Sequence, residues 1–376
     1  MIPVFRPSYG KEETEAVKKV LLSGWAGLGP KTEEFERKFA DYIGTKYAVA
    51  LNSCTAALHL ALKAMGIEKR EVITTPMTFV STNHAILYND ARPVFCDIYE
   101  DTLNMNVDEI EGLITKNTRA ILPVHYGGHA CDMDRIMELA KKYGLKIIED
   151  CAHACGGEYK GRKVGSIGDA GCFSFHAVKN LATGDGGMVT TNDKEVYLRL
   201  RKLRWLGISK GTWEREKEHK KYDWQYDVEE IGYKDHMNDI TAAIGIVQLG
   251  KLDGLNQKRS SIVQMYNRGL ANVPSIERPV EKTYAKSAWH IYAIKLEKRN
   301  ELNAYLQSKG ISTGVHYYPN HLFDLYKKYR RVLPAAERTW ERVLTLPLFP
   351  DLKKSDARWI IKEIRTFCKK DKANSS

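Results

Sequence analysis

The first two thirds of the chain alternate between short apolar runs and amphipathic segments. The apolar runs are shorter than most helices and rich in β-branched residues, so each predicts a buried strand. They are YAVAL (47–51), REVITTP (70–76), RPVFCDI (92–98), TRAILPVHY (118–126) and LKIIED (145–150), followed by GCFSFH (171–176) and GGMVTT (186–191). Helices are predicted between them; SCTAALHLALKAMG (53–66) has a possible cap in Ser53 or Thr55 and a glycine stop. This alternation predicts a mostly parallel sheet with helices on both faces.

The pattern changes beyond about residue 250. YAIKL (292–296) and STGVHYY (312–318) predict strands, and RNELNAYLQSKG (299–310) and KKSDARWIIKEIRTFCKK (353–370) predict helices. We therefore expect an α/β protein of two domains, a large one over residues 1–250 and a smaller α+β one over 251–376. The charged segment 209–227 predicts a long loop between elements.

Composition and charge exclude several classes of protein. Hydrophobic residues make up 43% and charged residues 28%, which is typical of a soluble globular protein. No run of about 18 apolar residues predicts a membrane helix, and MIPVFRPSYGKEE lacks the form of a signal peptide, so we expect a cytoplasmic location without membrane contact. The net charge of +11 is spread along the chain without a nucleic-acid-binding motif, so a solvated surface is favoured over a nucleic-acid partner.

The segment EDCAHACGG (149–157) places Cys151, His153 and Cys155 at alternate positions after two carboxylates. Such a group raises the possibility of a metal site or a redox pair. Zinc sites draw their ligands from two separated pairs, and no second pair is present, because the other cysteines stand alone. We therefore expect no metal and interpret both cysteines as small packing residues.

Candidate chemistry follows the strands, because ligands of open α/β sheets bind beyond the carboxyl ends of strands. The turn NSCTAAL can bring a phosphate to a helix N-terminus, Phe79 follows the second strand, and Asp150 ends an apolar strand. A carboxylate at a buried strand end needs a partner. Lys179 lies in a glycine-rich loop between two strands. Each feature alone is weak, but the set matches what pyridoxal phosphate needs: an amine, a carboxylate for the ring nitrogen, a phosphate turn and an aromatic.

Ten motifs in order carry a resemblance over residues 2–365. They are SGWAGLGPKTEEFE (23–36), NSCTAALHLAL (52–62), TPMTFVST (75–82), PVHYGGHACDMD (123–134), IIEDCAHACGG (147–157), CFSFHAVKNLATGDGGMV (172–189), GYKDHMNDITAAIG (232–245), SAWHIYAIKL (287–296), GISTGVHYYP (310–319) and LPLFP (346–350). With these motifs the chain resembles the DegT/StrS-type nucleotide-sugar aminotransferases. The resemblance implies fold type I of the pyridoxal-phosphate enzymes, with a mostly parallel seven-stranded sheet between helices and a smaller C-terminal domain.

The resemblance also implies a role for each matching residue. Lys179 binds the cofactor covalently and carries protons, and Asp150 pairs with the ring nitrogen. The other cofactor-binding residues implied are Phe79 stacked on the ring, His153 beside it, and Thr55, Ala56 and Ser174 at the phosphate. His316, Tyr317 and Tyr318 are implied on the substrate side, where ordinary strand-end packing explains them equally well.

Two stretches depart from the family pattern. Many relatives have Asn at the position of Lys234. The resemblance implies that the residue at this position contacts the cofactor phosphate of the partner subunit in a homodimer. The next two residues, Asp235 and His236, also differ from the usual Tyr and Arg or Asn, so sugar contacts do not transfer from this loop. RWLGI (204–208) lacks the histidine that often precedes the glycine.

The implied reaction moves an amino group from L-glutamate, leaving 2-oxoglutarate, to a keto group, expected at C4, of a nucleotide-linked deoxysugar in surface-polysaccharide or glycan biosynthesis. One alternative is a dehydratase of the same family; some relatives become dehydratases when histidine replaces the lysine, which is intact here as Lys179. A second alternative, from a different class, is a non-catalytic regulatory or nucleic-acid-binding protein on this fold.

Overall fold

The computed structural model describes residues 1–209 and 226–375, with side chains through residue 369. Most of the predicted charged loop 209–227 lies outside the described residues. Within the described part, the central element is a seven-stranded sheet in the order β1-β9-β8-β5-β4-β2-β3. Its strands are β1 (Tyr47–Leu51), β2 (Glu71–Thr74), β3 (Arg92–Phe95), β4 (Thr118–Leu122), β5 (Lys146–Asp150), β8 (Ala170–Ser174) and β9 (Gly187–Thr191).

Among these strands, β9 alone is antiparallel to its neighbours, β1 and β8. The other neighbouring pairs, from β8 to β3, are parallel. The prediction of a mostly parallel sheet is confirmed. The antiparallel strand makes residues 175–186, between β8 and β9, the loop of a hairpin.

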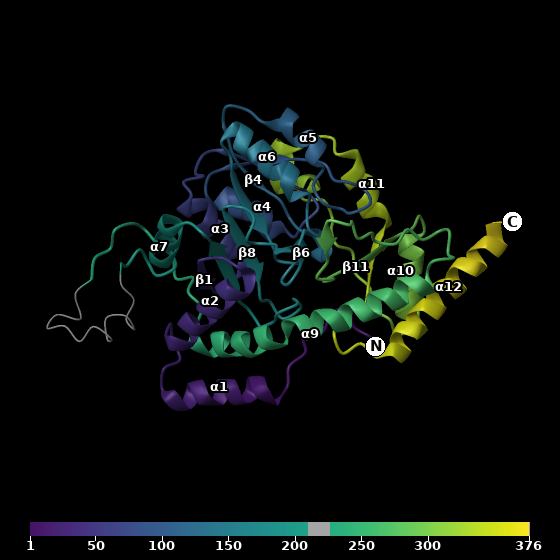
Figure 1. Ribbon diagram of the computed structural model, residues 1–376. Helices are drawn as coiled ribbons and strands as arrows, with labels where there is room; N and C mark the ends of the chain where they lie inside the picture. The colour runs from purple at the N-terminus through teal and green to yellow at the C-terminus, as the bar shows by residue number, and fades with distance from the viewer. Residues whose placement is uncertain (210–225, 376) are drawn as a thin grey trace.

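Helices cover both faces of the sheet, as apolar strands without alternation require. One face packs against α3 (Cys54–Ala64) and α7 (Lys194–Leu203), with α4 (Val80–Tyr88) beside α3. The other packs against α2 (Pro30–Ile43) and α6 (Met133–Tyr143), with α5 (Val107–Leu113) beside α6. The two resulting cores are separated by the sheet, and α1 (Lys11–Ser23) lies outside them against α9 (Figure 1).

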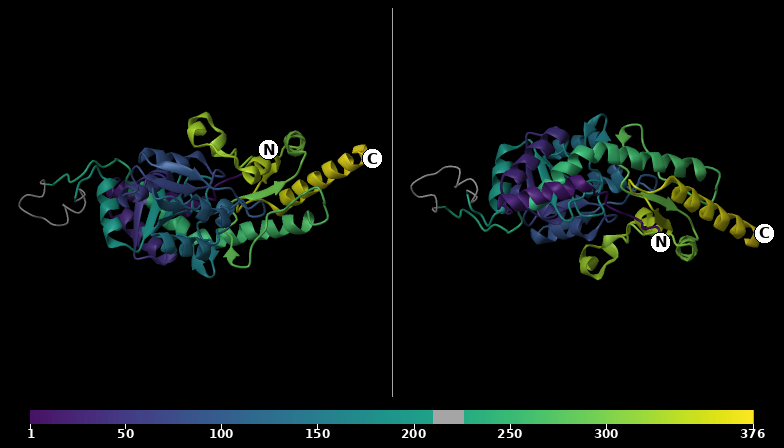
Figure 2. Two further views of the ribbon diagram at one scale, coloured as in Figure 1. Left: turned by 90° about the horizontal axis from the view of Figure 1, so that it is seen from above. Right: turned by 90° about the horizontal axis from the view of Figure 1, so that it is seen from below.

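The helix α9 (Asp239–Gly269) runs along both parts of the molecule (Figures 1 and 2). Its first half packs on α1 and α2, and it also packs on α12 (Lys354–Ser375). The predicted domain boundary at residue 250 falls inside this helix. The C-terminal part has its own core around Tyr266, Tyr292 and Leu346, with α10 (Arg299–Ser308), α11 (Pro334–Arg342), β11 (Tyr292–Lys295) and β12 (Val343–Leu346).

Short elements complete the described chain. A three-stranded ribbon contains β6 (Glu158–Tyr159), β7 (Arg162–Lys163) and β10 (Ala285–Lys286), and 3-10 turns cover Tyr126–Gly128, Asn320–Leu322 and Asp324–Tyr329. No helix among the described residues is both long and apolar enough to cross a membrane.

One predicted strand is wrong. Residues 312–318 form no strand; only Gly314 bridges the backbone of Thr345. The reason is that side chains, rather than a backbone ladder, fix this segment. His316 Nδ1 lies 2.9 Å from Thr345 Oγ1, and Tyr317 Oη lies 2.8 Å from His153 Nε2. The segment thus connects the C-terminal part to the loop that follows β5 of the large sheet.

Candidate active site

A cavity of about 410 Å³ opens at the carboxyl ends of β5 and β8. The wall of the cavity is formed by five stretches of the chain around the large sheet and by one segment from the C-terminal part. Eight of the residues predicted from the sequence line it: Thr55, Phe79, Asp150, His153, Ser174, Lys179, His316 and Tyr317. The fold therefore brings together residues that are up to 262 positions apart, from Thr55 to Tyr317.

Three predicted residues do not line this cavity. The N–H of Ala56 donates to Ser53 Oγ at 3.1 Å, so it serves the helix cap. Tyr318 packs against Phe323 and Trp340, with ring centroids 5.0 and 4.9 Å away. Lys234 is exposed on a neighbouring loop, outside the wall of its own chain's cavity.

The N-terminus of α3 forms one end of the cavity. Ser53 is its N-cap, and Cys54 and Thr55 are the first two helical residues, whose N–H groups have no carbonyl partner inside the helix. A Cβ on Gly187 would lie 2.3 Å from Ser53 O, so only glycine lets β9 approach this turn so closely. Ser174, 7% exposed, adds a hydroxyl nearby in the wall. Free N–H groups, the helix dipole and a hydroxyl suit a phosphate.

Asp150 presents its carboxylate to the cavity from the end of β5. Its side chain is nearly inaccessible, and it accepts hydrogen bonds from Thr82 Oγ1 at 2.8 Å and from the Ala152 N–H at 3.0 Å. Burial raises the pKa of this carboxyl, although the two donors and the charge of Lys179 partly oppose that effect. The strand-end carboxylate therefore has hydrogen-bond partners, as expected. Its two oxygens can still accept further hydrogen bonds.

Sequence reasoning missed Thr82, which holds Asp150 from α4. Thr78, just before α4, and Thr82, in its first turn, have their hydroxyl oxygens 2.7 Å from each other. Because Thr82 donates its proton to Asp150, Thr78 must donate to Thr82. Two hydroxyl residues four positions apart just after a strand end are the signal that could have revealed this relay.

Lys179 lies in the hairpin loop between β8 and β9 and lines the same cavity as Asp150. Within the described residues, no hydrogen bond or ion pair is formed by its ammonium group. Burial lowers the pKa of Lys179 to about 8, against the weaker opposing effects of Cys54 and Asp150. An amine with this pKa is partly neutral at physiological pH, and so can act as a nucleophile and a base.

His153 and Tyr317 form another part of the cavity wall. The Gly127 N–H points at His153 Nδ1 from 3.4 Å, so the ring proton is on Nε2 and is donated to Tyr317 Oη. Burial, with the charge of Lys179, holds the pKa of His153 well below its usual value, which keeps the ring neutral. The Tyr317 hydroxyl therefore retains its own proton for an acceptor in the cavity.

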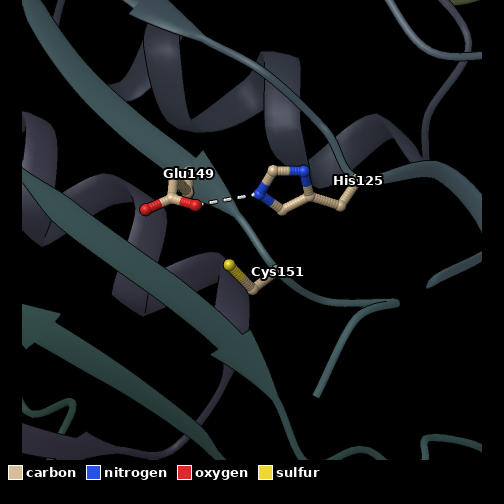
Figure 3. Close-up of side chains that lie close together, drawn as sticks. All are labelled: His125, Glu149 and Cys151. Carbon is tan, nitrogen blue, oxygen red and sulfur yellow. Dashed lines mark hydrogen bonds and ion pairs between the residues drawn. The ribbon is translucent and has the colours of Figure 1, made fainter. Parts of the chain in front are cut away.

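A buried cluster behind Asp150 has the composition of a metal site. His125, Glu149 and Cys151 lie together, and His125 Nε2 is 3.0 Å from Glu149 Oε2 (Figure 3). The side-chain atoms of His125 and Glu149 are already engaged: His125 Nδ1 accepts the Cys131 N–H, and Glu149 also accepts three backbone N–H groups. Burial raises the pKa of the Cys151 thiol well above its usual value. Hydrogen bonds therefore account for the close approach of His125 and Glu149.

Comparison with known proteins assigns the chain to a family. The model of the DegT/DnrJ/EryC1/StrS aminotransferase family matches residues 7–365, and the chain belongs to that family. It is 42% identical over 380 residues to the spore coat polysaccharide biosynthesis protein SpsC of Bacillus subtilis, covering 98% of this chain and 97% of SpsC.

Two solved structures support the same assignment. The putative sugar aminotransferase Spr1654 of Streptococcus pneumoniae, in its PMP form, aligns with a TM-score of 0.92 and 34% identity over 98% of this chain and all of that one. The Helicobacter pylori aminotransferase PseC, involved in pseudoaminic acid biosynthesis, aligns at 0.91 and 31% identity over 98% and 99%. The protein is a sugar aminotransferase of fold type I, with pyridoxal phosphate as its cofactor.

The cavity fits that cofactor. Lys179 supplies an unpartnered amine, Asp150 a buried carboxylate with spare acceptor capacity, and the start of α3 free N–H groups for a phosphate. Phe79, 59% exposed at the mouth, offers an aromatic face. The individual roles of these residues remain predictions, but each chemical group that the cofactor needs is present in one cavity.

Proposed function

We propose that the protein transfers an amino group from L-glutamate to the C4 keto group of a nucleotide-linked keto-deoxysugar. The observation that carries this proposal is that the amine of Lys179, without a hydrogen-bond partner among the described residues, lines the same cavity as the buried carboxylate of Asp150. The likeness to a spore coat polysaccharide biosynthesis protein supports a place in surface-polysaccharide or glycan synthesis. The positive net charge of +11 suits a diphosphate-bearing substrate.

Pyridoxal phosphate, when bound, supplies a ring that delocalises the electrons left when the amino acid loses its α-proton. Lys179 takes that proton in the first half-reaction and returns a proton to the sugar carbon in the second. Its pKa of about 8 makes both directions accessible near neutral pH, since both the neutral and the charged amine are populated.

Asp150 would hold the ring nitrogen and its proton. Thr82 and the Ala152 N–H fix the orientation of this carboxylate, and the low-dielectric surroundings strengthen its attraction for a cationic nitrogen. The neutral His153–Tyr317 pair adds a hydroxyl donor to the cavity wall without adding charge. We propose that His316 and Tyr317 face the sugar, and that Tyr318 contributes only through packing.

We also propose a cytoplasmic homodimer in which Lys234 of each chain reaches the cofactor phosphate of the partner subunit. Lys234 is exposed and outside its own cavity, which supports a contact beyond its own chain. Neither a nucleic acid nor a membrane takes part. Light scattering tests the assembly: full activity from a monomer would contradict this assignment of Lys234.

The decisive experiment has two stages. The purified protein is first incubated with L-glutamate alone, and 2-oxoglutarate is measured; its formation is expected here, whereas its absence would favour the dehydratase. A panel of GDP-, UDP- and dTDP-linked keto sugars is then added, and mass spectrometry identifies the one that gains an amine. Lys179→Arg serves as the control, because it keeps the charge but should lose both half-reactions.

A further inference from the structure

Two loop segments next to the active site pair with each other and carry an aromatic ring opposite a cation. Trp205 and Lys234 form a backbone bridge, and Leu206 N–H donates to Tyr233 O at 2.9 Å. These are the two stretches, 204–208 and 234–236, in which the sequence departs from the family pattern. The structure therefore joins the two departures into one local unit.

Lys234 extends over the indole of Trp205. Its Nζ lies 3.5 Å from the ring centroid, which is the geometry of a cation–π contact with the aromatic that binds cations best. Among the described residues, no carboxylate lies within ion-pair distance of Lys234. The ammonium is thus held in place by an aromatic face and keeps its charge available for an anion.

The rest of this unit fixes the indole and attaches it to the cavity wall. The ring of His236 packs edge-on against Trp205 at 4.4 Å, and burial, aided by Lys234 and Arg204, lowers the pKa of His236 to about 4. The imidazole is therefore neutral and does not repel the ammonium. The Asn52 N–H donates to Asp235 O at 2.8 Å, one residue before Ser53 in the cavity wall.

We propose that Trp205 is a positioning residue that holds the Lys234 ammonium ready to bind a phosphate ester. This inference rests on the proposed function, in which Lys234 reaches the phosphate of the cofactor in the partner subunit. An asparagine amide, as in many relatives, is a short group with few rotamers. A lysine has a long flexible stem, and ordering it on binding costs entropy. Stacking on Trp205 restricts the stem before the phosphate arrives.

The test measures cofactor affinity in the protein after removal of bound cofactor, with pyridoxal phosphate and with pyridoxal, which lacks the phosphate. Trp205→Leu should weaken pyridoxal phosphate binding about threefold to fivefold, the range of an exposed cation–π contact, and leave pyridoxal binding unchanged. Trp205→Phe, which keeps an aromatic face, should lose less. In a Lys234→Asn background, Trp205→Leu should have no further effect.

Trp359→Leu is the matched control, because Trp359 on α12 also lies beneath a lysine, with Lys362 Nζ 5.4 Å from its ring. It should change neither affinity. Equal weakening for both ligands, or an unchanged effect of Trp205→Leu without Lys234, would show a merely structural Trp205 and overturn the inference. Failure of the proposed function looks different: the unaltered protein would not prefer pyridoxal phosphate to pyridoxal, and borohydride would fix neither to Lys179.

Discussion

Glu149 and Asp150 are adjacent acidic residues at the end of β5, almost equally buried, on opposite faces of the strand. Glu149 accepts a hydrogen bond from His125 (Figure 3). It also accepts hydrogen bonds from the N–H groups of Gly165, Ile167 and Gly168. Asp150 accepts two and faces the cavity. Burial alone does not distinguish a structural carboxylate from a functional one. The remaining capacity of Asp150 to accept hydrogen bonds does distinguish the two.

The two carboxylates also differ in the direction of their pKa shifts. Burial acts to raise the pKa of Glu149, but His125 and the backbone donors outweigh it, and the pKa is lowered overall. Glu149 therefore stabilises the fold above its unfolded pKa, and this stability is lost as the pH falls through its folded pKa. For Asp150 burial prevails and raises the pKa, so stability falls as the pH rises from its unfolded pKa through its folded one.

The largest expected effect comes from Asp150→Asn. It should lower turnover about 10³-fold, because the carboxylate proposed to hold the ring nitrogen of the cofactor is lost. In the protein without cofactor, the variant should be as stable as the parent or more stable at pH 7, since a carboxyl group whose charged form is disfavoured by burial is replaced by a neutral amide. Steady-state kinetics and thermal unfolding measure the two effects. Near-normal turnover would refute the role of Asp150.

Glu149→Gln should give the opposite result. The amide nitrogen would face backbone N–H donors, and we expect a loss of about 3 kcal/mol of unfolding free energy at pH 7. This loss should shrink at acid pH, where Glu149 itself becomes protonated. Turnover per folded, cofactor-loaded molecule should change less than tenfold. A specific loss of activity with unchanged denaturant unfolding would contradict the structural interpretation.

Thr82→Val tests the relay from α4. It removes one of the two donors to Asp150, so the pKa of Asp150 should rise further and the acid limb of the pH–rate profile should move upward. The expected loss of turnover is about tenfold or less. Ser81→Ala is the matched control, because Ser81 lines the same cavity without a hydrogen bond to Asp150 among the described contacts. An unshifted acid limb would argue against the relay.

The smallest expected effect concerns Lys179. In the cofactor-free protein its reaction with an amine reagent should accelerate as the pH rises through about 8, because the neutral amine is the reactive form. Asp150→Asn should move this midpoint downward, since the attraction of the anion for the ammonium is lost. Glu149→Gln should leave the midpoint in place. A midpoint unchanged in both variants would place the Asp150 charge too far from Lys179 to affect it.

The sequence predicted the positions of Asp150 and Lys179 after strands, because a carboxylate ending an apolar strand and a lysine between two strands are visible locally, and both residues line the cavity; their roles stay predictions. It was sufficient for the sheet, because buried parallel strands are nearly continuous apolar runs. It was not sufficient for Thr82 or for the partners of Glu149, since those contacts depend on how distant segments meet. The wrong strand over 312–318 has the same cause: side-chain contacts to His153 and Thr345 replace the backbone ladder.

The hairpin of β8 and β9 has a consequence for the order in which the site assembles. Its strands are neighbours in sequence and pair directly, so Lys179 is carried by contacts of short sequence separation, which form quickly. Asp150 depends on the parallel pairing of β5 with β4, across a connection that contains α6, and with β8, across residues 151–169; both connections are longer than the hairpin loop. The contacts that position Lys179 therefore span shorter stretches of sequence than the contacts that position Asp150. Slowing the crossover, for example by lengthening the loop before α6, should delay the appearance of cofactor binding without delaying the hairpin.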